Sequence, residues 1–280
     1  MKNNFWRKYN GIIIPWAPPH ISFNLTKSQV IYDISTNNAL LARWTTNFDS
    51  KLELPFWYII NDKVIKFKDY SRNTKSKIKR GLKKLNVKII NKDDLLEHGY
   101  SVYMKAIKRY SVVLNKKSYF DFKDEIESLD SSWQIWGVYC NSNNQLVAYS
   151  LNRNSNDYCD YSTIKFDPLF LKDYSSYVLY YSMNKYYLGE KKVKYVSNGT
   201  RSISHQTNIH EFLIEKFKFR KAFCKIELIY SKKINFLVNF LYPFRIIFSF
   251  IPANFFRKIY IILFQEEIKR HCRKVCKNLQ

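Results

Sequence analysis

Acidic residues are scarce in this sequence. It has 23 Asp and Glu against 47 Lys and Arg, which gives a formal net charge of +24 at pH 7. A charge of this size favours polyanionic partners, namely nucleic acid, anionic lipid headgroups or phosphorylated substrates. An AT-rich coding sequence enriches a protein in Lys, Asn, Ile, Tyr and Phe, and all five are abundant here. Compositional drift is therefore the alternative source of the positive charge.

A disulfide framework and a metal-binding motif are also missing. The cysteines are odd in number, irregular in spacing and set in a chain too long for a disulfide-stapled module, so we expect reduced thiols. Cys272 and Cys276 stand one helical turn apart beside His271, but no second pair of ligands lies nearby, and we expect no metal. The five cysteines are Cys140, Cys159, Cys224, Cys272 and Cys276.

Long apolar runs are missing as well. The three isoleucines at 12–14 are stopped by Pro15, so no run of signal-peptide length follows the basic start, and we expect a cytoplasmic protein. Pro243 and Arg245 interrupt the apolar stretch 234–251, which argues against a spanning helix of about 20 residues. The hydrophobic fraction of 46% and the charged fraction of 25% are those of a folded globular chain.

Apolar periodicity and turn residues predict an α/β fold. We expect a hairpin of residues 57–60 and 64–67, a basic helix after Ser71 with Ile78, Leu82 and Leu85 as its apolar stripe, and a strand at 86–90. Helices follow at 93–111 and 117–129, then a three-strand meander at 133–140, 146–152 and 158–166.

The second half of the predicted sheet is reached through a crossover. A helix at 174–188 leads to a strand at 193–197, and a helix at 206–218 leads to a last strand at 219–230. An antiparallel meander followed by a parallel neighbour gives a mixed, mostly antiparallel sheet flanked by helices. The predicted divisions are an N-terminal strand and turn extension with a helix near 37–44 (1–56), the α/β domain (57–231) and a basic amphipathic tail (232–280).

This element order resembles the GNAT superfamily of N-acyltransferases, and it is most similar to the GNAT-like halves of Fem-type aminoacyl transferases of peptidoglycan synthesis. The resemblance covers residues 58–230 and includes the basic helix, the stretch Tyr-Ser-Thr-Ile-Lys-Phe-Asp-Pro at 161–168, and Lys-Phe-Lys-Phe at 216–219, where Lys218 replaces the usual Gly. Fem-type enzymes normally carry two such halves, and the sequence displays one.

The resemblance implies a donor site. In the superfamily, the pantetheine arm of an acyl-CoA, such as acetyl-CoA, lies between the strands that correspond to 158–166 and 193–197, and its pyrophosphate meets the next helix N-terminus. Asp173 opposes an anion there, and the Gly-containing signature of this turn is absent, which leaves aminoacyl-tRNA as the alternative donor, or lost activity. The implied donor-binding residues are Lys165, Lys172, Tyr174, Ser175 and Ser176.

The loop 197–208 follows the parallel strand, where ligands bind in open α/β sheets, and it holds the candidate catalytic residues. A histidine side chain suits a general base, so His205 is the candidate base, and Arg201 suits a carboxylate or phosphate of the acceptor. The alternatives are that His205 caps the next helix and that Arg201 pairs with an acid. Asn198 and Tyr161 complete the set, and strand alternation places Tyr161 on the same face as Lys165.

Two basic segments suggest partners. Residues 63–92 hold twelve Lys and Arg, which suit either a solvated helix face or a groove for a phosphorylated acceptor or tRNA. The tail 232–280 predicts kinked helices in the headgroup layer of an anionic membrane, or helices packed on the domain or on a second copy. The basic residues expected on lipid are Lys232, Lys233, Arg257, Lys258, Lys269, Arg270, Arg273 and Lys274.

Three functions remain open from the sequence. The first is a bacterial acyl-CoA-dependent transferase that acts on an amino or hydroxyl group of a cell-envelope glycan or lipid-linked precursor at the inner face of the cytoplasmic membrane. The second is a Fem-like transferase that uses aminoacyl-tRNA. The third is a membrane-peripheral binding module without catalysis.

Overall fold

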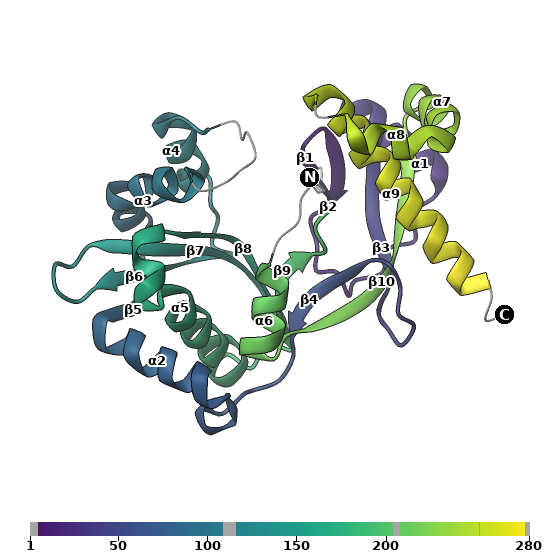
Figure 1. The fold of residues 1–280 in the computed structure, drawn as a ribbon. Coiled ribbons are helices and arrows are strands. Elements are labelled where there is room, and N and C mark those ends of the chain that lie inside the picture. The colour runs from purple at the N-terminus through teal and green to yellow at the C-terminus, as the bar shows by residue number, and fades with distance from the viewer. Residues whose placement is uncertain (1–4, 109–115, 204–207, 252, 278–280) are drawn as a thin grey trace. The chain divides into compact units, whose positions relative to one another are not determined.

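The computed structural model describes all residues except 1–4, 109–115, 204–207, 252 and 278–280. The chain forms two compact units, each assembled from separate stretches (Figure 1). Unit 1 comprises Met1–Tyr58, Thr200–Thr207 and Lys221–Gln280, and unit 2 comprises Ile59–Gly199 and Asn208–Arg220. The N-terminal extension and the tail, which the sequence divides from each other, therefore belong to one unit.

Unit 2 is built on a mixed sheet. Antiparallel pairing joins β5 to β6, β6 to β7 and β7 to β8, whereas β9 pairs with β8 in parallel. β4, most of which belongs to unit 2, lies beside β9. The predicted fold class is confirmed. The strands are β4 (Trp57–Asn61), β5 (Leu85–Ile90), β6 (Trp133–Cys140), β7 (Leu146–Ser155), β8 (Tyr158–Phe166) and β9 (Tyr195–Thr200).

Helices cover both faces of this sheet. α3 and α4 lie over one face, and α2 and α5 lie over the other (Figure 1). The 3-10 turn η2 and then α5 connect β8 to β9, so the N-terminus of α5 lies at the end of the sheet where β8 ends. The elements are η1 (Phe67–Asp69), α2 (Arg72–Lys84), α3 (Lys92–Ile107), α4 (Tyr119–Glu127), η2 (Pro168–Asp173), α5 (Ser175–Asn184), the π-helix η3 (Lys185–Glu190) and α6 (Ile209–Phe217).

Unit 1 has its own core, packed around four strands of the sheet. Its strands follow the order β1-β2-β3-β10, with α1 against β3. The helix predicted near 37–44 is wrong, because residues 41–50 form a strand. The helix of this region, α1, precedes that strand and is capped by Thr26, whose hydroxyl accepts a hydrogen bond from the Gln29 amide. The elements are β1 (Trp6–Tyr9), β2 (Ile12–Pro15), α1 (Lys27–Thr36), β3 (Leu41–Ser50), β10 (Arg220–Tyr230), α7 (Lys232–Leu241), η4 (Tyr242–Phe244), α8 (Arg245–Phe250) and α9 (Asn254–Lys277).

The tail packs into the core of unit 1 along one side. Val238 of α7 and Leu263, Ile268 and Cys272 of α9 are buried in one cluster with strands β2, β3 and β10. The carboxylate of Glu266 accepts hydrogen bonds from the Tyr230 hydroxyl (2.8 Å) and from Arg270 Nε (2.9 Å), and it contacts Lys269 Nζ at 3.4 Å.

Three of the tail cations expected on lipid are therefore engaged inside unit 1. Lys269 and Arg270 bind Glu266, and Arg273 lies 3.9 Å from Glu227. The expectation is corrected for Lys269, which is buried. The side chains of Arg270 and Arg273 stay 44% and 54% exposed, so their contact with lipid stays a prediction.

A close contact between α2 and α5 positions the start of α5. The buried face of α2 consists of Thr74, Ile78 and Gly81, whereas Leu82, which the sequence placed in the stripe, is exposed. A Cβ atom on Gly81 would lie 2.5 Å from Val178 Cγ1 and 3.3 Å from the Asp173 carbonyl oxygen. The missing side chain thus lets the two helices approach.

Tyrosines fill much of the core between the sheet of unit 2 and α5. Tyr161 and Tyr187 have ring centroids 5.9 Å apart, and Tyr70 packs on Phe217 at 5.9 Å. Burial is the main cause that raises the pKa of Tyr70, of Tyr161 and of Tyr187 above the ordinary value. All three are therefore neutral phenols in the folded state at neutral pH.

Leucine at position 81 is expected to destabilise the protein. Overpacking of this kind costs roughly 1–3 kcal/mol, although leucine is the better helix former by roughly 1 kcal/mol. We expect a lower urea midpoint for Gly81→Leu. Gly189→Leu is the matched control, because a Cβ there meets nothing within 4 Å. Equal midpoints for the two variants would contradict the packing.

The buried tyrosines predict a loss of stability at alkaline pH. Because their folded pKa values are raised, their contribution is complete below the unfolded value of about 10 and is lost as the pH rises above it, at about 1.4 kcal/mol per pH unit for each group. We expect Tyr161→Phe to flatten the fall of the denaturation midpoint between about pH 9 and 11. The exposed control Tyr32→Phe should keep the wild-type slope, and equal slopes for both variants would refute the assignment.

Candidate functional site

The two parallel strands β8 and β9 separate soon after they begin to pair. They are in register at Tyr158 with Tyr195, at Cys159 with Val196 and at Asp160 with Ser197, and the pairing ends there. β8 continues to Phe166 and β9 to Thr200. The structure therefore opens the gap that the resemblance implies, at the end of the sheet where α5 begins.

Several side chains beside the end of this pairing are exposed to solvent. Ser162 is exposed, and Thr163 and Ile164 are partly exposed, although all three belong to a strand in the interior of the sheet. On the opposite side, Gly199 has a φ of +79°, and a Cβ atom added there would meet no atom within 4 Å.

A β-bulge at Ser162 accompanies the separation. Leu151 of β7 is opposite Thr163, but its neighbour Asn152 is opposite Tyr161, so Ser162 is an extra residue. Such an insertion reverses which face the following side chains point to.

The bulge corrects the expectation that Tyr161 and Lys165 share a face. The Tyr161 hydroxyl donates to Asn184 Oδ1 of α5 at 2.9 Å, whereas Lys165 Nζ lies 6.0 Å from the ring centroid of Tyr103 on α3. α3 and α5 cover opposite faces of the sheet (Figure 1). Tyr161 is also buried, so it packs in the core and does not line the gap.

The start of α5 is suited to binding an anion. No side chain caps this helix, its first turn contains no acid, and Tyr174 before it adopts the left-handed conformation with a φ of +65°. The Ser175 hydroxyl is buried without a hydrogen-bond partner, and Ser176 is partly exposed. The free amides and the positive end of the helix dipole favour negative charge here.

Basic side chains of α2 surround this helix start. Lys84 Nζ binds the Asp173 carboxylate at 2.5 Å and so neutralises the acid that opposes an anion. The Arg80 guanidinium lies 5.0 Å from the ring centroid of Tyr174, and Lys77 Nζ donates to the Tyr177 hydroxyl at 3.3 Å. Lys172, which precedes Asp173, is exposed.

These α2 residues were predicted only as a basic helix face. Lys77, Arg80 and Lys84 are spaced three and four residues apart, so they share one side of α2. That spacing is the sequence signal for a cluster, but the sequence does not reveal that the cluster lies beside the start of α5.

The structure places the residues predicted for catalysis in different environments. The Tyr180 hydroxyl donates to Asn198 Oδ1 at 2.9 Å, which fixes Asn198 directly after the last paired residue of β9. His205 lies outside the described residues. Arg201 is part of unit 1.

Arg201 is held by structural contacts. Its guanidinium donates to the Pro55 carbonyl oxygen and lies 4.6 Å from the ring centroid of Trp57 and 5.5 Å from that of Phe264. Burial lowers the pKa of this side chain. The structure thus places Arg201 between two aromatic rings, and its role toward an acceptor stays a prediction.

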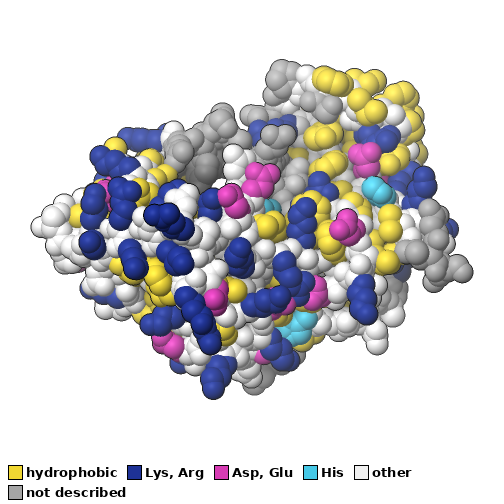
Figure 2. Space-filling view, turned by 60° about the horizontal axis from the view of Figure 1, so that its bottom comes forward, with side chains coloured by type: hydrophobic (Ala, Val, Ile, Leu, Met, Phe, Trp, Pro, Cys, Tyr) yellow, Lys and Arg dark blue, Asp and Glu magenta, His cyan; other side chains and the backbone are white. Residues whose placement is uncertain are grey.

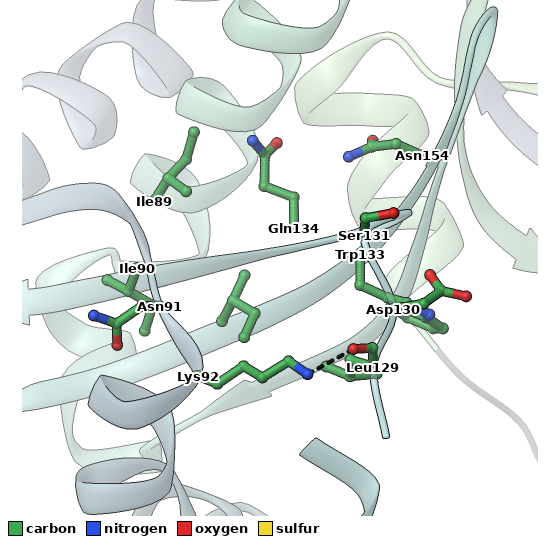
Figure 3. A pocket seen from close by; sticks show the side chains of 11 residues that line it. Ile89, Ile90, Asn91, Lys92, Leu129, Asp130, Ser131, Trp133, Gln134 and Asn154 are labelled. Carbon is green, nitrogen blue, oxygen red and sulfur yellow. Dashed lines mark hydrogen bonds between the residues drawn. The ribbon is translucent and has the colours of Figure 1, made fainter. Parts of the chain in front are cut away.

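A cavity of ≈ 430 Å³ lies elsewhere in unit 2 (Figure 3). Ile89, Lys92, Trp133 and Asn154 line it, at the end of the sheet opposite to the gap. Lys92 Nζ donates there to the carbonyl oxygens of Glu127 and Leu129, so the one cation in the lining closes a loop. This cavity is not part of the candidate site.

Within the part of the chain that the structure describes, no group of three or more His, Cys, Asp or Glu side chains is placed to hold a metal ion. Among the described helices, none combines the length and the apolar character that crossing a bilayer requires.

Comparison with known proteins supports the fold. No model of a known protein family matches the sequence, and no curated protein matches it. Among solved structures, the crystal structure of FemX matches with a TM-score of 0.57 and 8% identity over 83% of this chain and 85% of FemX. L-PGS from Bacillus licheniformis matches with a TM-score of 0.50 and 10% identity over 95% of this chain and 85% of that chain.

These matches are likenesses of fold. Each extends over more of the chain than either unit contains, and the chain spans most of FemX. The resemblance seen in the sequence is confirmed at this level: the chain has a GNAT-like fold related to that of Fem-type transferases.

Proposed function

We propose that the protein is an acyltransferase that holds the thioester arm of an acyl-CoA, such as acetyl-CoA, in the gap between β8 and β9. The observation that carries this proposal is the end of the pairing of β8 with β9 after Asp160 and Ser197, while β8 continues beside β7 to Phe166. A pantetheine arm carries amide groups that can pair with strand backbone, and it is thin enough for such a gap. The bulge at Ser162 supports the same use, because it turns the strand where the arm would enter.

The start of α5 would receive the pyrophosphate of the donor. The uncapped amides of the first turn of α5, from Ser175 onward, provide donors. Lys77, Arg80 and Lys172 provide positive charge around them. Lys84 contributes indirectly because it holds Asp173 away from the anion. Among the predicted donor-binding residues, Ser175 and Ser176 lie in the first turn, whereas Lys165 is assigned to the α3 side of the sheet.

The chemistry requires few groups. The acceptor nitrogen or oxygen attacks the thioester carbonyl, a base takes the proton, the oxyanion is stabilised, and CoA leaves as the thiol. Because the Asn198 carbonyl oxygen accepts from Tyr180, its amide NH₂ group is the donor we assign to the oxyanion. His205 remains our candidate for the base, Arg201 remains a candidate contact of the acceptor, and Tyr161 receives a structural role.

We assign the acceptor to the cell envelope, as an amino or hydroxyl group of a glycan or lipid-linked precursor. The Fem-type resemblance and the apolar, basic tail support this class, and we propose the inner face of the cytoplasmic membrane as the location of the protein. The mechanism needs only that the acceptor reach the thioester at the open end of the gap.

A donor of the aminoacyl-tRNA class is the second candidate. The basic residues of α2 and its surroundings favour it, and Lys and Arg side chains spread widely over the face of unit 2 seen in Figure 2. The same cluster that would bind a pyrophosphate could bind the phosphates of a tRNA acceptor end. The two donors differ in how strongly salt weakens their binding.

An added acid at the start of α5 should separate donor binding from folding. Ser176→Asp places a carboxylate in the first turn, where the helix dipole favours it by about 0.3–1 kcal/mol, so the fold should be kept. The same charge repels a pyrophosphate, and we expect calorimetric titration to show CoA binding weakened by about tenfold or more, which is about 1.4 kcal/mol. Ser176→Asn is the uncharged control of similar shape and should bind as the wild type does. Unchanged binding by Ser176→Asp would contradict the donor site.

The two donors are distinguished by filter binding and by calorimetry on the wild-type protein. An acyl-CoA enzyme should bind CoA, and its retention of tRNA should be no stronger than that of any basic protein. A tRNA-dependent enzyme should retain charged tRNA with a steep salt dependence that Arg80→Glu reduces and Lys116→Glu does not. Binding of neither donor would support the third alternative, a binding module without catalysis.

A further inference from the structure

The outer surface of α7, η4 and α8 in unit 1 is apolar. Six large hydrophobic side chains there are at least half exposed, with Phe236 at 72% and Phe250 at 80% as the most exposed of α7 and α8. A helix on the surface of a globular protein normally turns polar side chains outward. We call these six residues the tail patch: Phe236, Phe240, Phe244, Ile246, Ile247 and Phe250.

The inner face of the same segment is already used. Ile234, Val238 and Leu241 of α7, and Phe248 of α8, pack on the core of unit 1. The segment is therefore apolar on both sides, and its outer side is not required for the packing of unit 1. Figure 2 shows hydrophobic side chains gathered on this part of unit 1.

Charge indicates what covers the tail patch. The sequence contains no Asp or Glu between Glu227 and Glu266, whereas Lys232, Lys233 and Lys258 are exposed at the two ends of the segment. An apolar surface flanked by cations is complementary to the interface of an anionic bilayer, where acyl chains lie below negative headgroups. A second copy of this chain would instead bring a net charge of +24 against the same charge.

We propose that the tail patch is a membrane-docking surface that inserts its phenylalanine and isoleucine side chains among anionic lipids, with Lys232, Lys233 and Lys258 on the headgroups. The C-terminal part of α9 stays in unit 1, because Glu266 and Tyr230 hold it. The inference deepens the membrane part of the proposed function and rests on it only for the location of the acceptor. It does not need acyl transfer.

Vesicle sedimentation tests the proposal with the full chain. The wild type should bind vesicles of phosphatidylglycerol and phosphatidylcholine, and should bind vesicles of phosphatidylcholine alone at least tenfold more weakly. The variant Phe236→Ser/Phe240→Ser/Phe250→Ser should lose at least tenfold of its binding to the anionic vesicles, and Lys232→Glu/Lys233→Glu should lose several-fold.

The matched control removes three equally exposed hydrophobic side chains elsewhere, as Tyr32→Ser/Val64→Ser/Phe120→Ser, and it should bind vesicles as the wild type does. Circular dichroism verifies that each variant is folded. Absence of wild-type binding, or equal binding by the tail-patch variant, overturns the proposal. A dimer in light scattering that the tail-patch variant converts to a monomer overturns it in favour of a second copy.

Calorimetric titration with CoA on the same proteins separates the two proposals. The tail-patch variant should bind CoA as the wild type does, since the start of α5 belongs to unit 2. If the wild type binds CoA but not anionic vesicles, the docking surface is refuted and the donor site stands. If it binds the vesicles but not CoA, the donor site is refuted and the docking surface stands.

Discussion

The three residue pairs that join β8 to β9 are the constraint on which the site depends. Three parallel pairs, ending at Asp160 and Ser197, are enough to set β9 beside β8, and they leave the rest of β8 without a strand on that side. Buried backbone groups normally find partners, so an interior strand left open on one side is a place where a ligand can supply them. The bulge at Ser162 and the left-handed Gly199 lie on the two sides of this opening.

The second element of the site is the electrostatics of the start of α5. Helix dipole and uncapped amides alone attract an anion weakly in water, and Asp173 would cancel part of that attraction. The close packing of α2 on α5, which Gly81 permits, brings Lys84 to Asp173 and Arg80 to Tyr174. The site thus depends on Gly81 through the packing of α2 on α5.

Much of the fold could be predicted from the sequence, because the sequence patterns that define its strands and turns are local. The strands at 133–140 and 158–166 were predicted with the bounds that the structure has, since alternation and Asn-rich turns define a meander within a few residues. The predicted strand at 64–67 is wrong, because Val64 is exposed and a 3-10 turn begins at Phe67. The helix α1 was missed, although Thr26 followed by Gln29 is the spacing of an N-terminal cap.

The site was harder to predict because its determinants are distant in sequence. The bulge that sends Tyr161 and Lys165 to opposite faces depends on the register of β7 against β8, which alternation within one strand cannot reveal. Arg201 suggested an acceptor site, but its aromatic neighbours Trp57 and Phe264 come from segments far away in the chain. The pairing of Lys84 with Asp173 spans 89 residues for the same reason.

The central claim is that the unpaired part of β8 binds the donor arm through its backbone. Hydrogen exchange of the backbone amides, with and without saturating CoA, tests it most directly. The account predicts slower exchange confined to the β8 residues after Asp160 and to the first turn of α5. Unchanged exchange in β8, or protection centred on the cavity beside Lys92 and Trp133, would contradict it.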